Sequence, residues 1–216
     1  MARVLALVLL IAQDPGAVPL PRHAAWLKRH EAMVEEAKRR DVDLLLLGDS
    51  LMDAWRGQKA LWEERFAPLK AANFGMMGDR TEHLLWRLRH GALARRPRAA
   101  MLLIGANNLG WGGQGVDSTA AGVEAVVNEL RPARILLLAL FPQGDSPDDP
   151  LRSKIQETNA RLARIAGVRF LDLGPLFLKS DGTLARELMP DGVHLSDKGY
   201  RVWADAVREP LAELLR

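Results

Sequence analysis

The sequence predicts an α/β fold, a three-layer α/β/α sandwich built around a parallel sheet of about five strands. Two observations predict it. Short, continuously apolar runs recur five times, and a stretch with helical spacing of apolar residues separates each run from the next. Strands that are apolar throughout are covered on both faces, as in parallel sheets. The 216 residues show no internal repeat and suit one compact domain.

Each element can be placed by its pattern. The apolar runs that we expect to be strands are 42–47, 71–74, 99–104, 134–141 and 168–171. An amphipathic helix over 24–40 precedes the first strand, because apolar residues recur there at helical spacing among charges. The remaining predicted helices are 60–66, 81–93, 117–130, 151–165 and 197–215.

The first residues resemble an export signal. A basic start at Arg3 precedes an apolar run, Val4 to Ala12, and a proline-rich stretch that cannot be helical follows. This order is typical of a secretory signal, and the run is too short for a stable membrane anchor. We therefore expect a secreted or periplasmic protein, with the signal ending at Ala12 or Ala17.

This interpretation divides the chain into three parts: a signal peptide over 1–17, a linker over 18–23 and the folded domain over 24–216. The alternative is that the N-terminus is a strand or helix packed on the domain of a cytoplasmic protein.

The composition excludes several classes of function. There is no cysteine, which rules out thiol catalysis, a cysteine zinc site and disulfides. The net charge of +3 is mild, and the basic run Arg95 to Arg98 contains no interleaved aromatic residues. We expect that run to be a solvated connector and the protein to have no nucleic-acid partner.

Polar or glycine-containing blocks follow the first three predicted strands. The first block, 48–51, contains Ser50. The second block, 75–79, contains Gly78, and the third block, 105–108, contains Asn107. Ligands bind outside the carboxyl ends of the strands in open parallel sheets. With the strand order 2-1-3-4-5, the three blocks converge at one edge.

A base for Ser50 must come from one of five histidines. Four of them lie in or beside predicted helices: His23, His30, His83 and His90. His194 lies in a long irregular connection, 174–196, three residues after Asp191. Long loops in compact domains are often functional, and a carboxylate at this spacing can orient an imidazole.

Together these residues predict a serine esterase that acts on a small acyl ester. Ser50 is the expected nucleophile, His194 its base and Asp191 the group that orients His194. The backbone N–H groups of Ser50 and Gly78 and the side-chain amide of Asn107 are the expected oxyanion donors. This chemistry needs no metal and no cofactor.

At these residues the chain resembles the SGNH, or GDSL, hydrolases, a family named for Ser, Gly, Asn and His in four blocks. Within it, the resemblance is to the catalytic subunits of platelet-activating-factor acetylhydrolase and their bacterial relatives. The matching segments are Asn73-Phe-Gly-x-x-Gly-Asp79, His83–Leu88, Gly105-x-Asn-Asn108, Pro150–Arg152 and Ser180–Thr183. The resemblance implies a flavodoxin-like fold, no metal or organic cofactor, and hydrolysis of small acyl esters.

Two positions depart from the family pattern. Many members carry Asp at the position of Asn108, whereas the acetylhydrolase branch carries Asn there, as this chain does. Met77 replaces a glycine that is usual in the acetylhydrolases, which can narrow or reshape the acyl pocket. We expect Met77, Asn108 and Trp111 to contact substrate, together with Asp49, which also braces its loop through backbone hydrogen bonds.

Three alternatives remain beside this interpretation. The segment Gly110 to Gly115 fits the dinucleotide motif G-x-G-x-x-G, but five residues separate it from its strand and the ribose-binding acid is missing. A catalytically silent binding or dimerisation domain would not need Ser50, Asp191 and His194. Among esterases, the substrate is either a lipid or a carbohydrate ester, and the oligomeric state stays open, with a homodimer as one alternative.

Overall fold

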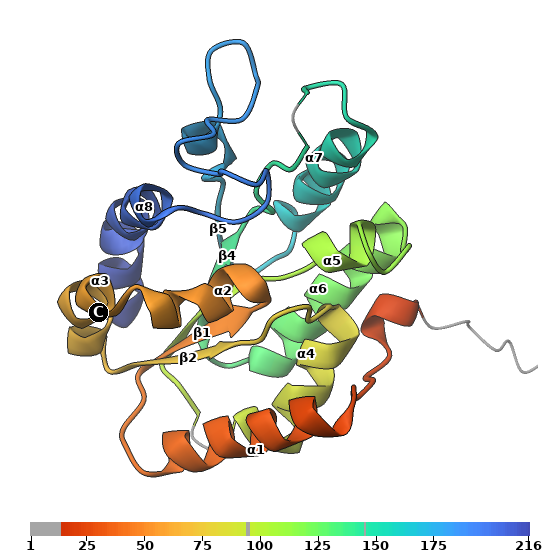
Figure 1. Ribbon diagram of the computed structural model, residues 1–216. Helices are drawn as coiled ribbons and strands as arrows, with labels where there is room; N and C mark the ends of the chain where they lie inside the picture. Colours follow the sequence, from red (N-terminus) through yellow and green to blue (C-terminus); the bar gives the residue numbers. More distant parts are fainter. Residues whose placement is uncertain (1–13, 94–95, 145) are drawn as a thin grey trace, which may run out of the picture.

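The computed structural model describes residues 14–93, 96–144 and 146–216 (Figure 1). It confirms the predicted α/β class: five strands form one all-parallel sheet in the order β2-β1-β3-β4-β5. The strands are β1 (Leu44–Gly48), β2 (Ala71–Gly75), β3 (Ala99–Leu103), β4 (Arg134–Leu138) and β5 (Arg169–Leu171). Since β1 lies between β2 and β3, the three blocks that follow these strands share one edge.

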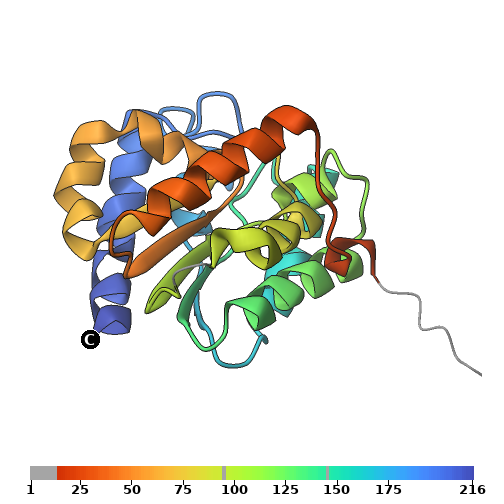
Figure 2. The same cartoon turned by 90° about the horizontal axis from the view of Figure 1, so that it is seen from below.

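Helices cover both faces of the sheet. They are α1 (Ala24–Lys38), α2 (Ser50–Asp53), α3 (Lys59–Arg65), α4 (Thr81–Arg87), α5 (Ala106–Leu109), α6 (Val116–Leu130), α7 (Pro150–Leu162) and α8 (Asp197–Leu215). Helix α6 contacts both α4 and α7, and α1 contacts the π-helical extension of α4, η4 (Leu88–Ala92). Helices α3 and α8 contact each other on the opposite face (Figures 1 and 2).

The described part of the chain also contains short 3₁₀ helices. They are η1 (Pro15–Ala17), η2 (Ala54–Gly57), η3 (Ala67–Leu69) and η5 (Gly174–Phe177).

The core lies on both faces of the central strands. The four leucines of β1, Leu44 to Leu47, are each at most 1% exposed, and β3 is buried throughout. Burial of such a side chain contributes roughly 1.5–3 kcal/mol to folding. This explains why the strands read as unbroken apolar runs and why alternation is absent.

Two helical turns were not expected from the sequence. Helix α2 begins at Ser50 and α5 begins at Ala106, each directly after a strand. Each has four residues, which is too short for a helical period to show in the sequence. Both carry candidate site residues.

The N-terminal segment before α1 lies against the domain. Gly16 is buried, where its N–H donates to Ser118 Oγ (3.1 Å) and its carbonyl accepts from Thr81 Oγ1 (2.9 Å). Farther along, Leu20 N–H donates to the carbonyl of Glu82 (3.1 Å). Residues 18–23, expected as a linker, therefore run along the domain surface.

Most of the predicted signal peptide, residues 1–13, lies outside the described residues, so export stays a prediction. Within the described part of the chain, no helix is both long enough and apolar enough to cross a membrane.

Candidate active site

Ser50 stands at the carboxyl end of β1, where the chain turns from strand to helix. Asp49 caps α2 by accepting a hydrogen bond from the backbone N–H of Leu51 (3.1 Å). The Oγ of Ser50 lies 3.0 Å from Nε2 of His194, 144 residues later in the chain. The structure thus brings the predicted nucleophile within hydrogen-bond distance of its predicted base.

Asp191 accepts three hydrogen bonds in the turn that carries His194, two of them from His194 itself. Its Oδ1 accepts from the backbone N–H groups of Val193 (2.9 Å) and His194 (2.7 Å), and its Oδ2 lies 2.7 Å from His194 Nδ1. Although partial burial acts in the opposite direction, these contacts lower the pKa of Asp191 to about 2. An ionised carboxylate can only accept, so Nδ1 carries the proton and Nε2 is free to accept from Ser50.

The second block presents a free backbone N–H near Ser50. Gly78 has a φ of +73°, a left-handed conformation that favours glycine. The preceding amide, that of Met77, donates to Asp53 Oδ2 (3.2 Å), which fixes the entry to this turn. Among the described residues, nothing accepts a hydrogen bond from the Gly78 N–H, so it is available to a substrate oxygen.

Asn107 joins the third block to the second. Its Nδ2 donates to the backbone carbonyl of Asp79 (2.9 Å), and its side chain lines the same cavity as Ser50 and Gly78. The amide carries a second N–H, which is the one that an oxyanion would use.

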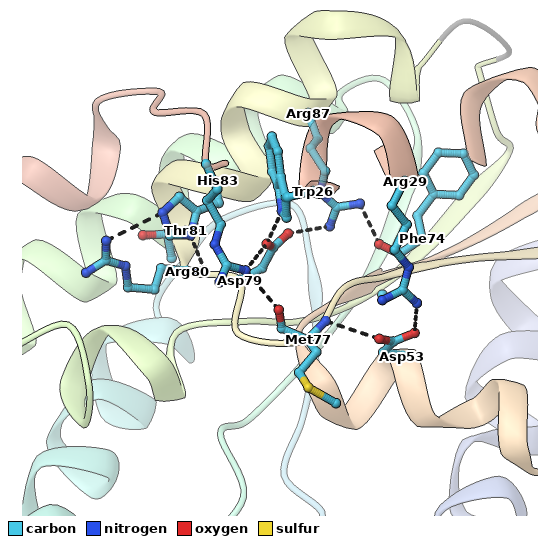
Figure 3. A network of polar contacts seen from close by, with 12 residues as sticks. Trp26, Arg29, Asp53, Phe74, Met77, Asp79, Arg80, Thr81, His83 and Arg87 are labelled. Carbon is cyan, nitrogen blue, oxygen red and sulfur yellow. Dashed lines mark hydrogen bonds and ion pairs between the residues drawn. The ribbon is translucent and has the colours of Figure 1, made fainter. Parts of the chain in front are cut away.

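A buried ion pair supports the second block from the interior of the domain (Figure 3). The side chains of Asp79 and Arg87 are fully buried, and Arg87 Nη2 lies 2.8 Å from Asp79 Oδ2. Trp26 Nε1 donates to Asp79 Oδ1 (2.7 Å), and Arg87 Nη1 donates to the carbonyl of Phe74 (2.7 Å). The turn that carries Gly78 is therefore fixed to α1, α4 and β2.

A second, more exposed pair supports the same turn. Asp53, whose Oδ2 accepts from Met77, forms ion pairs with Arg29 of α1 and with Arg56 (2.6 Å). The two arginines keep this carboxylate in place under the turn.

Of the candidate catalytic and oxyanion residues, all but Asp191 line a cavity of about 750 Å³. It is lined by Leu20, Pro21, Arg22, His23, Ser50, Met77, Gly78, Arg80, His83, Asn107, Trp111, Gly112, Val193 and His194. A separate cavity of about 560 Å³, lined by residues of α1, α3 and β2, contains none of the candidate catalytic side chains.

The four expected substrate contacts divide into two pairs. Met77 and Trp111 line the cavity, and they are 67% and 95% exposed. Asp49 and Asn108 are buried and do not line the cavity. Burial raises the pKa of Asp49 to about 7, so this carboxyl is partly protonated near neutral pH.

Asn108 braces the loops instead of facing a substrate. Its Oδ1 accepts from the Thr81 backbone N–H (3.0 Å), and its Nδ2 donates to Glu82 and Gln114 (2.9 Å each). A side chain with all its polar atoms in use has none left for a ligand.

Sequence reasoning missed one wall of the cavity. Leu20, Arg22 and His23 come from the segment that was expected to be a linker, and Arg80 and His83 come from the start of α4. Arg80 is held in this wall by an ion pair with Glu82 (2.8 Å). The non-helical segment before α1 was visible in the sequence, but its docking against the second block was not.

The described residues contain no group of three or more histidines, aspartates or glutamates positioned to hold a metal ion.

Comparison with known proteins gives consistent results. Residues 46–202 match the family model of the GDSL-like lipase/acylhydrolases. The chain is 36% identical over 214 residues to platelet-activating factor acetylhydrolase IB subunit alpha1 of Homo sapiens, a match that covers 94% of this chain and 92% of the relative. It is 35% identical over 219 residues to subunit alpha2 of Gallus gallus, with the same coverage.

Solved structures share the fold at lower identity. A GDSL-like lipase from Bacteroides thetaiotaomicron superposes with a TM-score of 0.73 at 17% identity, covering 86% of this chain and 97% of the other. A variant of an acetylxylan esterase from Geobacillus stearothermophilus superposes with a TM-score of 0.63 at 20% identity, covering 79% and 93%.

Proposed function

Because the chain belongs to the GDSL-like lipase/acylhydrolase family and is a carboxylic ester hydrolase, we propose that it hydrolyses short, acetyl-type acyl esters with Ser50 as nucleophile. The observation that carries the proposal is the 3.0 Å contact between Ser50 Oγ and His194 Nε2, with Asp191 bound to the opposite ring nitrogen. This is the arrangement that activates a serine hydroxyl.

The reaction proceeds in two halves. Ser50 Oγ attacks the ester carbonyl carbon while its proton passes to His194 Nε2. The carbonyl oxygen becomes an oxyanion that accepts from the N–H groups of Ser50 and Gly78 and from the Asn107 amide. His194 then gives the proton to the departing alcohol, which leaves an acyl-serine. Water, deprotonated by His194, attacks this ester, and the free acid leaves as Ser50 regains its proton.

Two features support a small acyl group. The relatives with 36% and 35% identity are named acetylhydrolases. In addition, Met77 lines the cavity next to Gly78, in the place of a glycine that is usual in the acetylhydrolases, so its side chain occupies part of the space beside the proposed oxyanion donor. A carbohydrate O-acetyl ester is a second candidate substrate, because Trp111 is 95% exposed at the rim, where its ring can stack on a sugar.

The test is a hydrolysis panel with 4-nitrophenyl esters from acetyl to octanoyl, acetylated xylan and a 2-acetyl phospholipid analogue. We expect the highest kcat/KM for acetyl esters and a loss of turnover in Ser50→Ala. Equal turnover by wild type and Ser50→Ala would remove Ser50 from the mechanism. A fully inactive but folded wild type would favour the silent binding domain.

Secretion or a periplasmic location remains part of this proposal, with a cytoplasmic location as the alternative. Cell fractionation distinguishes the two locations, and N-terminal sequencing of any exported protein locates the cleavage site. Cleavage after Ala12 leaves η1 in place, whereas cleavage after Ala17 removes the buried Gly16 and its two hydrogen bonds.

A further inference from the structure

One methionine side chain among the described residues is largely open to solvent. Met77 is 67% exposed, whereas the remaining described methionines are at most 7% exposed. These buried residues are Met33, Met52, Met76, Met101 and Met189. The chain has no cysteine, so all its sulfur is in methionine. A dissolved oxidant therefore reaches the thioether of Met77 before that of any other described residue.

The backbone of Met77 is held at both of its polar groups. Its N–H donates to Asp53 Oδ2 (3.2 Å), and its carbonyl accepts from Arg22 Nη1 (2.9 Å). The side chain takes no part in these contacts, and Figure 3 shows it extending away from the buried pair of Asp79 and Arg87. A chemical change at the sulfur can therefore alter the side chain while the turn stays in place.

The exposed thioether belongs to the candidate catalytic cavity. Met77 lines this cavity together with Ser50 and His194, and it directly precedes Gly78, the proposed oxyanion donor. An ester bound in the cavity therefore lies beside the Met77 side chain. Because the thioether is apolar and flexible, it can adapt to such a ligand and lose its contact with water at little cost.

Oxidation would change the character of this side chain. A methionine sulfoxide is polar and carries an oxygen that accepts hydrogen bonds, whereas the thioether is only a weak acceptor. Covering the sulfoxide with the apolar part of an ester removes it from water, which costs free energy unless a donor replaces the water. The oxidised protein should therefore bind the ester less well.

We propose that Met77 is a site of reversible oxidation, at which a hydroperoxide converts the thioether to a sulfoxide and lowers the esterase activity. The sulfur attacks the hydroxyl oxygen of the peroxide, so that an S–O bond forms and the O–O bond breaks. The hydroxyl proton passes to the departing oxygen, which leaves as water or an alcohol. A dithiol reverses the step with a methionine sulfoxide reductase: the oxygen leaves as water and the dithiol becomes a disulfide. This inference rests on the proposed function, because the activity that it concerns is ester hydrolysis.

The test exposes the folded protein to hydrogen peroxide and follows two quantities in the same samples. Peptide sequencing by mass spectrometry locates each added oxygen, and turnover of 4-nitrophenyl acetate gives kcat/KM. We expect Met77 to gain its oxygen first and kcat/KM to fall in step with it, by about tenfold at full oxidation. Methionine sulfoxide reductases for both sulfoxide epimers, supplied with dithiothreitol, should then restore kcat/KM.

Variants at two adjacent positions assign the effect to one sulfur. Met77→Leu keeps an apolar side chain of similar volume that peroxide does not oxidise, so its kcat/KM should be the same before and after treatment. Met76→Leu removes the sulfur of the buried neighbour and is the matched control, which should stay as sensitive to peroxide as the wild type. Met77→Gln has a neutral polar side chain, and without any peroxide its kcat/KM should be about tenfold below that of Met77→Leu, mainly through KM.

An equal loss of kcat/KM in wild type and Met77→Leu would overturn the proposal, because the damage would then lie elsewhere. Complete oxidation of Met77 with an unchanged kcat/KM would overturn it as well. A wild type that hydrolyses no ester before treatment would overturn the esterase function and, with it, the effect on activity. Peptide sequencing separates the two failures, since oxidation of the buried methionines ahead of Met77 would overturn the modification site whether or not the protein is an esterase.

Discussion

The two sides of the candidate site are built in opposite ways. Behind Gly78, the side chains of Asp79 and Arg87 are fully buried and joined to three different elements. On the other side, the side chains of Asp191 and His194 are 55% and 46% exposed and held by hydrogen bonds within a single turn.

This difference matches the tasks that we propose for the two sides. Donors that stabilise an oxyanion act best when they are already in place, so they gain from a buried and rigid support. A base must exchange protons with the leaving alcohol and with water, which requires access to solvent. Substitutions on the exposed side should therefore change activity alone, whereas those on the buried side should also change stability.

The largest effect should come from the exposed side. His194→Ala removes the base and should lower kcat for 4-nitrophenyl acetate by about 10⁴–10⁶-fold. Its free energy of unfolding, measured in urea, should change by no more than about 0.5 kcal/mol, as at other solvent-accessible positions. A destabilisation of several kcal/mol would contradict the expectation that substitutions on the exposed side change activity alone.

On the buried side, Arg87→Met should lower the free energy of unfolding by about 3–5 kcal/mol, because it leaves the Asp79 carboxylate buried without its main partner. The matched control is Arg89→Met in η4, which breaks the partly exposed pair with Glu129 (2.9 Å) and should cost less than about 1 kcal/mol. Urea denaturation measures the free energy of unfolding of both variants. Equal losses in the two variants would show that the buried pair contributes no more to stability than the partly exposed pair.

Asn107→Ala tests the junction of the two sides. It should reduce transition-state stabilisation by about 3–4 kcal/mol, mostly through kcat. Loss of the hydrogen bond to the Asp79 carbonyl should lower the free energy of unfolding by only about 1 kcal/mol. An unchanged kcat would remove Asn107 from the mechanism.

Asp49 adds a pH dependence to the buried side. Its pKa is about 7 in the folded protein, against an ordinary value of 3.8. Between these values the folded state keeps a proton that the unfolded state releases, so rising pH lowers stability. This group should contribute a loss of about 2–3 kcal/mol between pH 5 and pH 7.5.

Asp49→Asn should remove that part of the pH dependence, because the amide is neutral and its Oδ1 can still accept from the Leu51 N–H. Urea denaturation of both proteins at the two pH values makes the comparison. Parallel pH profiles would mean that Asp49 does not retain its proton.

The fold could be predicted because it depends on regular patterns. Continuous apolar strands alternating with amphipathic helices require a covered parallel sheet, and the strand order follows from placing the three blocks together. The short helices α2 and α5 could not be predicted, since four residues do not define a period. The sequence predicts Asn108 as a substrate contact, yet in the structure it is buried among Thr81, Glu82 and Gln114.

The sheet, its helical layers and the residues that could serve as nucleophile, base and donors were predictable from the sequence, because these features depend on residue type and local spacing. Which groups meet across long separations depends on how the layers pack: Trp26 meets Asp79, Arg22 meets the Met77 carbonyl, and Ser50 meets His194. Such contacts join segments from 53 to 144 residues apart. No local pattern records them, because they form only when the packed layers bring those segments together.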